Sequence, residues 1–332
     1  MAHLDAYNRP ISYLRISVTD RCNLRCMYCM PAEGVAWRPH ERVLRYEEIE
    51  TIARAAAELG ITKVRLTGGE PLVRLGITDL VGMIARIPNI DDLAMTTNGI
   101  LLARYAEPLA EAGLHRVNIS LDTLDPVRFR EITRCGELAD TLEGIAAARE
   151  AKLDPIKINS VVIRGMNDDE VVDLAAKTLE AGWWNIRFIE LMPVGNGELM
   201  TQAWEERVVT ADEIRARIET AFGPLQPAKM ETGGGPARYF RLPGGKGTLG
   251  FITPISEHFC YRCNRLRLTA DGQLRPCLLS DHEIDLRSPL RRGADAEEIK
   301  ALIVEGINAK PMRHHLGEHL HPAGRVMSEI GG

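Results

Sequence analysis

Short apolar runs alternate with longer amphipathic stretches over residues 1–191. The apolar runs are rich in β-branched residues and predict six strands, at residues 14–18, 63–66, 92–96, 116–121, 156–163 and 186–191. Residues 47–59 place Ile49, Ile52 and Ala56 on one helical face and stop at Gly60, a common helix-ending residue. Strands that alternate with helices run parallel, through right-handed crossovers. Six such units, fewer than the eight of a closed barrel, predict an α/β fold, a partial (β/α)6 TIM-type barrel.

The pattern changes after Met192, where glycine-rich turns separate shorter segments. A helix is expected at about residues 210–222. Strands and hairpins are expected at residues 238–242, 248–252 and 265–269. We therefore expect two domains, a partial barrel at residues 1–191 and a C-terminal α+β extension at residues 192–332.

Polar and glycine-rich motifs follow the expected strands rather than precede them. They occupy residues 22–29, 68–71, 97–99, 120–122 and 192–193. In α/β architectures the C-terminal ends of the strands form the functional rim. We therefore expect motifs that are scattered in the sequence to converge in space.

The composition fits an ordinary globular protein of 332 residues, 45% hydrophobic and 26% charged, with a net charge of −5. This balance and the lack of a long basic run argue against a protein that mainly binds the nucleic-acid backbone, but they allow a local anion site. No apolar stretch approaches the roughly 20 residues that span a bilayer, and the first residues lack the layout of a secretory signal. We expect a cytoplasmic protein that binds neither nucleic acid nor membrane.

Three of the seven cysteines, Cys22, Cys26 and Cys29, lie close together in the sequence. In a reducing compartment such spacing suits a metal or a cluster, because a tight loop can aim several sulfurs at one point. A structural zinc ion normally needs four ligands, and the next candidate, His40, lies some way downstream. Three thiolates on a cubane of four irons leave one iron open for another ligand. We therefore favour an iron–sulfur cluster over zinc.

The residues around this triad resemble a known family. The signature of the radical S-adenosylmethionine (SAM) enzymes is similar to the run RCNLRCMYCMP at residues 21–31, and their segment that holds the methionine amino group is similar to GGEP at residues 68–71. The resemblance implies that a [4Fe–4S] cluster with one open iron, chelated by SAM, is held by Cys22, Cys26 and Cys29. It implies that the SAM site is lined by Tyr28, Gly69, Ser120 and Met192. One electron from the cluster then cleaves SAM into methionine and a 5′-deoxyadenosyl radical.

A second triad lies in the C-terminal part and consists of Cys260, Cys263 and Cys277. A close pair with a remote third cysteine is common in zinc ribbons, so zinc is a stronger alternative here than at the first triad. His258 or His282 could complete such a zinc site.

Arginines beside the second triad favour a different interpretation. Arg265 and Arg267 are two apart on an expected strand, so they point to one face and can bind an anion together. Arg15 and Arg65 belong to the first two expected strands. Several guanidinium groups near one cavity, in a protein of negative net charge, suggest a polyphosphate substrate.

The whole chain resembles one branch of the radical SAM enzymes, the GTP 3′,8-cyclases that begin molybdenum cofactor biosynthesis. The match runs from residues 12–15 through the second triad to Gly331-Gly332, a terminal diglycine that in this branch reaches back to the active site. The resemblance implies that a second [4Fe–4S] cluster, whose open iron meets the guanine, is held by Cys260, Cys263 and Cys277. It implies that GTP is contacted by Arg15, Arg65, Thr96, Lys157, Arg265, Leu266 and Arg267.

The same resemblance implies the reaction. The radical takes hydrogen from ribose C3′, the carbon radical adds to C8 of guanine, and the product is (8S)-3′,8-cyclo-7,8-dihydroguanosine 5′-triphosphate. A monomer or homodimer would pass this product to cyclic pyranopterin monophosphate synthase. The sequence has no Walker-type phosphate loop, so GTP is expected to be rearranged rather than used for phosphoryl transfer.

Two other hypotheses stay open at this point. A radical SAM enzyme with an auxiliary cluster could modify peptides or other small molecules, although the arginines and the diglycine argue against it. A zinc-stapled binding module would be colourless, whereas the cyclase would be brown with roughly eight irons. We expect Cys135 to be a small buried or half-buried residue. A solvated or packing role is expected for His314, His315, His319 and His321.

Overall fold

The computed structural model describes residues 2–194, 199, 204–230, 234–314, 316 and 324–331. Within these residues twelve strands form one mixed sheet, in the order β14-β13-β12-β3-β4-β5-β6-β7-β8-β11-β10-β9. Its centre consists of six parallel strands: β3 (Tyr13–Ser17), β4 (Lys63–Thr67), β5 (Asp92–Thr97), β6 (Arg116–Ser120), β7 (Lys157–Val162) and β8 (Asn185–Glu190). All six expected strands are therefore confirmed.

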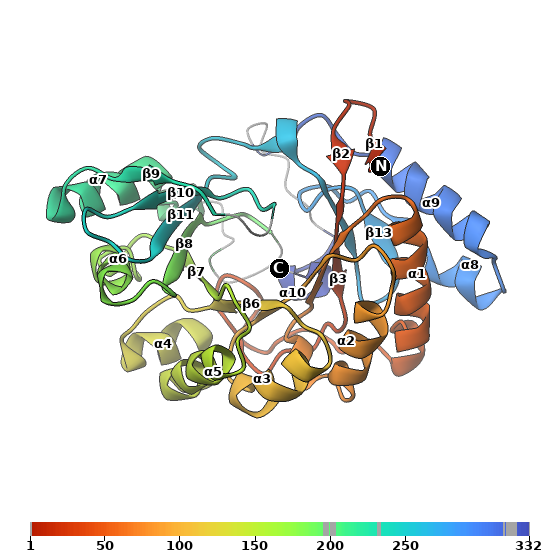
Figure 1. The fold of residues 1–332 in the computed structure, drawn as a ribbon, viewed down its shortest axis with the longest axis horizontal. Helices are drawn as coiled ribbons and strands as arrows, with labels where there is room; N and C mark the ends of the chain where they lie inside the picture. Colours follow the sequence, from red (N-terminus) through yellow and green to blue (C-terminus); the bar gives the residue numbers. More distant parts are fainter. Residues whose placement is uncertain are drawn as a thin grey trace.

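Helices follow the central strands and lie outside the curve of the sheet, whereas the C-terminus lies inside it (Figure 1). The helices that lie between these strands in the sequence are α1 (Tyr46–Glu58), α2 (Ile77–Ala85), α3 (Leu102–Glu111), α4 (Pro126–Thr133), α5 (Leu138–Glu150) and α6 (Val171–Glu180). The alternation of parallel strands and helices confirms the α/β fold with a partial barrel.

Residues after Met192 extend the central sheet at both edges. At one edge β12 pairs parallel with β3, and at the other β11 pairs parallel with β8. The strands of this part are β9 (Gln226–Ala228), β10 (Arg238–Arg241), β11 (Thr248–Ile252), β12 (Arg265–Leu268), β13 (Gln273–Arg275) and β14 (Ile284–Asp285). Its helices are α7 (Ala211–Phe222), α8 (Arg287–Arg291), α9 (Ala296–Asn308) and α10 (Met327–Ile330). The two parts of the sequence thus share one continuous sheet.

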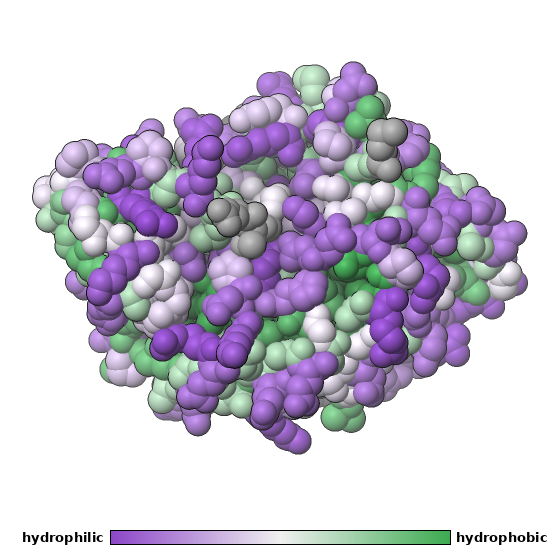
Figure 2. Space-filling model, in the orientation of Figure 1, coloured by the Kyte–Doolittle hydropathy of each residue, from purple (hydrophilic) through white to green (hydrophobic). Residues whose placement is uncertain are grey.

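A short sheet at the N-terminus pairs β1 (His3–Leu4) with β2 (Pro10–Ile11). In the described parts of the chain no helix is long and apolar enough to cross a membrane. Hydrophilic side chains cover much of the face seen in Figure 2, and hydrophobic ones are scattered among them.

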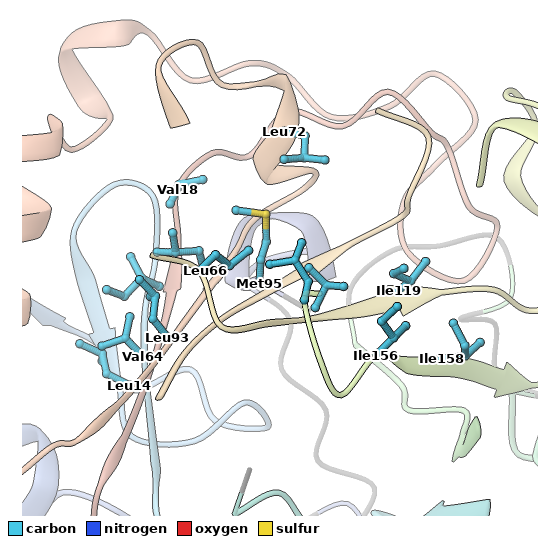
Figure 3. Packing of buried hydrophobic residues seen from close by; sticks show 14 of the residues in the cluster. Leu14, Val18, Val64, Leu66, Leu72, Leu93, Met95, Ile119, Ile156 and Ile158 are labelled. Atoms are coloured by element: carbon cyan, nitrogen blue, oxygen red, sulfur yellow. The ribbon is translucent and has the colours of Figure 1, made fainter. Parts of the chain in front are cut away.

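The hydrophobic core lies between the sheet and the outer helices. Successive side chains of a strand point to opposite faces, so Leu14 and Ile16 of β3 enter this core while Arg15 points the other way. Figure 3 shows the same packing for Val64 and Leu66 of β4. Burying each such side chain stabilises the fold by about 1.5–3 kcal/mol. The polar residues between them are thereby directed into the barrel interior.

Candidate active site

One cavity of about 310 Å³ brings together most of the residues singled out in the sequence. All six triad cysteines line it, although Cys22 and Cys277 are far apart in the chain. The expected SAM contacts that line it are Tyr28, Gly69, Ser120 and Met192. The expected GTP contacts that line it are Arg15, Arg65, Thr96, Lys157, Arg265 and Arg267. The expected convergence of the motifs is confirmed.

Leu266 is placed differently from its two neighbours. Its side chain is fully buried in the hydrophobic core, because it alternates along β12 with Arg265 and Arg267, which face the cavity. Its side chain is therefore unavailable to a ligand in the cavity, and any contact of Leu266 with substrate has to use the backbone.

The first triad lies in the loop after β3, where a tight turn groups the sulfurs. The Cys29 N–H donates to the Cys26 carbonyl at 2.9 Å, and the Leu24 N–H donates to the Cys22 sulfur at 3.4 Å. Burial raises the pKa of Cys22 and of Cys29 to about 12. Burial also raises the pKa of Cys26, and the neighbouring Cys29 and Cys22 raise it further. The loop therefore holds three thiols near one another in a setting that disfavours free thiolates.

This donor set fits an iron–sulfur cluster. N–H groups directed at cysteine sulfurs are a typical feature of such sites, and here they come from Leu24 and from Ser328 of the C-terminal tail. Among the described residues no three His, Cys, Asp or Glu side chains converge closely enough to hold a single metal ion. A cubane does not require that convergence, because each thiolate binds a different iron.

The GGEP segment after β4 is packed against the first triad loop. A Cβ at Gly69 would lie 2.3 Å from the Arg21 carbonyl oxygen, so this close backbone contact requires glycine. The Glu70 carboxylate accepts hydrogen bonds from the Thr97 hydroxyl and the Asn98 N–H, both at 2.7 Å. Burial raises the pKa of Glu70 to about 7. Glu70 thus ties the loop after β4 to the loop after β5.

Asp122 is a cavity residue to which the sequence analysis gave no role. It accepts a hydrogen bond from the Tyr28 hydroxyl and another from the Val161 N–H, both at 2.8 Å. Burial raises its pKa to about 6. Its place at the C-terminal end of the fourth central strand was the signal that could have revealed it. Asp122 fixes the position of Tyr28 in the cavity wall.

The second triad differs electrostatically from the first. Cys260 lies in a short 3-10 helix (Cys260–Arg262), Cys263 follows it, and Cys277 comes soon after β13. Although burial raises the pKa of Cys263, the charges of Arg265 and Lys310 outweigh it and lower this pKa to about 6. Cys263 is therefore a thiolate at neutral pH and ready to bind a metal.

Buried cations hold the loops of the second triad in place. The Arg9 guanidinium donates to the Cys260 carbonyl at 2.8 Å. The Lys310 ammonium donates to the carbonyls of Arg265 and Pro276, each at 2.7 Å. Both side chains come from distant parts of the chain and were missed by the sequence analysis, which had no local pattern to reveal them.

Basic side chains crowd the wall of the cavity that both triads line. Burial lowers the pKa of Arg15, and the charge of Arg267 lowers it further. Burial, together with the charge of Arg265, lowers the pKa of Arg267 to about 10. Burial, with the charges of nearby arginines, lowers the pKa of Lys157 to about 6. These basic groups are therefore buried close to one another in the wall, and a polyanion that binds there would stabilise their charged forms.

Two further polar residues complete this wall. Arg187 of β8 donates to the Asn159 side-chain oxygen at 2.5 Å, and both line the cavity. They lie directly opposite each other in the register of β7 and β8. Arg187 could have been found from the sequence, because it occupies an inward position of an expected strand. A buried arginine normally needs a partner.

The C-terminal tail enters the same site. Gly331 has a left-handed backbone conformation with φ +81°, and its carbonyl accepts a hydrogen bond from Arg267. A Cβ at this position would lie 2.7 Å from the Thr67 side chain and 3.1 Å from that of Ser17. Glycine is therefore required both by conformation and by space. Gly332 lies outside the described residues.

The structure describes the remaining cysteine and one of the four tail histidines. Cys135 is half-buried, and its thiol donates to the Asn23 carbonyl at 3.4 Å, as expected of a small packing residue. His314 lines the cavity, and its ring nitrogen lies 3.0 Å from the Pro254 carbonyl. The other three, His315, His319 and His321, lie outside the described residues.

The chain is similar to two known families in succession. Residues 16–177 match the radical SAM superfamily, and residues 184–316 match the family described as Molybdenum Cofactor Synthesis C. Among solved structures, the fold is similar to Streptococcus suis SuiB bound to SAM, with a TM-score of 0.59 and 15% identity, over 89% of this chain and 69% of that one. It is also similar to native anSMEcpe with bound SAM, with a TM-score of 0.52 and 15% identity, over 93% of this chain and 82% of that one. These likenesses show the fold.

Curated relatives match over nearly the full length. The GTP 3′,8-cyclase of Pelotomaculum thermopropionicum is 57% identical over 99% of both chains. The GTP 3′,8-cyclase of Moorella thermoacetica is 52% identical over 99% of both chains. The chain therefore belongs to the GTP 3′,8-cyclases, radical SAM enzymes that use SAM and an iron–sulfur cluster in the first step of molybdenum cofactor biosynthesis.

Proposed function

We propose that this chain converts GTP to (8S)-3′,8-cyclo-7,8-dihydroguanosine 5′-triphosphate, with release of 5′-deoxyadenosine and methionine, and that it does so with two [4Fe–4S] clusters. The observation that carries the proposal is the shared cavity, which is lined by two separate cysteine triads and a group of buried cations. One triad alone would suffice for SAM cleavage. A second triad in the same cavity as several basic side chains supports a nucleotide substrate bound next to a second cluster.

On the SAM side, the proposed ligands of the first cluster are Cys22, Cys26 and Cys29. When bound, SAM and its cluster supply the oxidising equivalent that removes hydrogen from the ribose. The GGEP loop and the loop after β5, tied together by Glu70, provide a rigid wall for the methionine end of SAM. Tyr28, fixed by Asp122, closes the wall near Ser120 and Met192 and limits access of water.

On the GTP side, the proposed ligands of the second cluster are Cys260, Cys263 and Cys277, which would orient the guanine. We assign the triphosphate to Arg15, Arg65, Lys157, Arg265 and Arg267. Charge-assisted hydrogen bonds from guanidinium groups to phosphate are short and directional, so they fix the ribose relative to SAM. Thr96 lies beside Arg65, which donates to its hydroxyl at 3.2 Å, and can contact the nucleotide from the same wall. Leu266 would contribute backbone groups only.

We also propose a domain boundary, a cellular location and the enzyme that receives the product. We place the functional boundary at residue 191, with SAM chemistry assigned to residues 1–191 and the second cluster, the substrate contacts Arg265 and Arg267 and the diglycine tail to residues 192–332. The remaining substrate contacts, from the strands before residue 191, line the same cavity. The protein would act in the cytoplasm as a monomer or homodimer. Its product would pass to cyclic pyranopterin monophosphate synthase.

Anaerobic reconstitution tests the proposal directly. The reconstituted protein should hold roughly eight irons, and it should form cyclised product from GTP but not from ATP or from peptides. Four irons, or zinc in place of the second set, would contradict the second cluster. Modification of a peptide without GTP turnover would contradict the assigned substrate.

A further inference from the structure

The C-terminal tail is held by charged residues that lie outside the cavity wall already described. We propose that Arg325 and Arg38, with the carboxylates of Asp271, Glu283 and Glu329, form a tail clamp that positions Gly331 against Arg267 for cyclisation of GTP. Arg325 and Arg38 are then positioning residues. The inference deepens the proposed function, because it rests on the assignment of Arg267 to GTP.

Arg325 forms the centre of the tail clamp. Its guanidinium donates to both oxygens of Asp271, at 2.9 and 3.0 Å, and to both oxygens of Glu283, at 2.6 and 2.8 Å. The Arg325 side chain is only 10% exposed. Burial raises the pKa of Asp271, but the hydrogen bonds from Arg325 and Thr269 outweigh burial and lower this pKa. A half-buried arginine with two bidentate carboxylates is far more ordered than an exposed ion pair.

Arg38 connects the tail to the loop that follows the first triad. Its guanidinium lies 3.2 Å from Asp271 and donates to Glu329 at 2.8 Å. Its backbone N–H donates to Asp20 at 3.0 Å, just before the first triad. Glu329 in turn accepts from the Val326 N–H at 3.1 Å, at the start of α10. The clamp therefore binds the tail at Arg325, before α10, and at Glu329, within α10.

Glu283 connects the tail to the second triad. It also accepts a hydrogen bond from Arg275 at 2.5 Å. Arg275 is fully buried, two residues before Cys277, and lies opposite Arg267 in the register of β13 and β12. One network of ion pairs thus joins the tail to the segments that carry both triads.

Two contacts of the tail after Arg325 show which groups the clamp would position. The Ser328 N–H points to the Cys29 sulfur, and the Gly331 carbonyl accepts from Arg267. Only five residues separate Arg325 from Gly331, and a glycine has more conformational freedom than other residues. Fixing the tail at Arg325 and Glu329 restricts that freedom and sets the direction in which Arg267 points. The clamp therefore acts on GTP through Arg267, without contacting the nucleotide.

Hydrogen exchange on the full-length protein without cofactors tests the clamp itself. In Arg325→Gln and in Glu329→Gln, amides of residues 326–331 should exchange about ten-fold faster or more, because the tail opens more often. Exchange elsewhere should stay at wild-type rates. Arg292→Gln is the matched control, since Arg292 pairs with Glu298 on the surface away from the tail. Wild-type exchange of the tail in both clamp variants would overturn the proposal.

Steady-state kinetics of the reconstituted proteins test what the clamp does. Both variants should keep wild-type iron content, raise the KM for GTP by about five-fold or more, and release more 5′-deoxyadenosine per cyclised product. Arg325→Lys should lie between wild type and Arg325→Gln, because it keeps the charge but not the four hydrogen bonds. A loosened tail with wild-type KM and coupling would also overturn the proposal. Failure of the proposed function is distinguishable, because wild-type protein itself would then give no product from GTP.

Discussion

Arg267 lies directly opposite Arg15 across β12 and β3, and Arg65 continues the same row on β4. Three guanidinium groups on neighbouring strands repel one another, and the charge of Arg267 helps to lower the pKa of Arg15. Hydrogen bonds hold two of the three in place: Arg65 donates to the hydroxyls of Tyr13 and Thr96, and Arg267 donates to the Gly331 carbonyl. A bound triphosphate would convert the repulsion into attraction.

Replacing Arg267 by alanine should weaken GTP binding by about 10- to 100-fold, the range expected for loss of a charge-assisted hydrogen bond to phosphate. SAM binding and the iron of the first triad should be unchanged. Calorimetric titration of the reconstituted protein with GTP measures the effect. Arg54→Ala, which removes an exposed ion pair on α1, serves as the control. An unaltered affinity for GTP would show that Arg267 does not bind the substrate.

The two triads should respond differently to cysteine replacement. Cys26→Ser should abolish release of 5′-deoxyadenosine, because the first cluster cleaves SAM. Cys277→Ser should spare some SAM cleavage while cyclised product is lost, because the second cluster orients the substrate. Chromatographic quantification of 5′-deoxyadenosine and product separates the two cases. SAM cleavage in Cys26→Ser, or a normal product rate in Cys277→Ser, would refute the corresponding assignment.

GTP binding should take up a proton at Lys157. Burial, with the charges of Arg187, Arg116 and Arg65, lowers the pKa of Lys157 to about 6, so the free protein holds this amine neutral at neutral pH. A triphosphate raises that pKa toward its ordinary value, so affinity for GTP should increase as the pH falls toward 6. Calorimetry in buffers of different ionisation enthalpy measures the uptake. Binding that is independent of buffer would contradict this role.

Lys157→Met provides the control and a second prediction. It should abolish the proton uptake and weaken GTP binding. At a pH between about 6, the pKa of Lys157 in the folded protein, and its higher ordinary pKa, the unfolded chain protonates this amine and the folded chain does not. Folding therefore releases a proton, which lowers the free energy of unfolding at neutral pH. Methionine removes that cost, so the melting temperature should rise by about 2–4 °C. A lower melting temperature would show that Lys157 stabilises the folded protein.

Gly69→Ala should disrupt the first triad loop. The new Cβ would lie 2.3 Å from the Arg21 carbonyl, so one of the two backbone segments has to move, at a cost of about 1–3 kcal/mol. Iron bound at the first triad should fall, as measured by metal analysis and by the visible spectrum. Gly82→Ala is the control, because Gly82 lies within α2 and its Cβ would meet the flexible end of Arg86 at 3.3 Å and the Ala112 carbonyl oxygen at 4.0 Å, an ordinary van der Waals distance. Wild-type iron content in Gly69→Ala would contradict this account.

Local patterns predicted the central sheet and much of the site. The strands alternate apolar and polar residues, so the inward direction of Arg65, and of Arg265 with Arg267, follows from sequence spacing. The cysteine triads are short-range motifs and need no knowledge of the fold.

The remaining features depend on contacts between distant residues. The pairing of β12 with β3 joins residues more than 200 positions apart, and no local pattern predicts it. The same holds for Lys310 beside the second triad, and for Arg187 with Asn159. The placement of Leu266 in the core, by contrast, follows from its alternation with Arg265 and Arg267 along β12.

The extension of the sheet at both edges has a consequence for biogenesis. During synthesis the first six parallel strands emerge from the ribosome with two unpaired edges, since β11 and β12 are translated later. Unpaired strand edges readily recruit other chains. The nascent chain therefore passes through an interval of exposure to aggregation, which ends only when β11 and then β12, up to Leu268, have emerged and paired with β8 and β3.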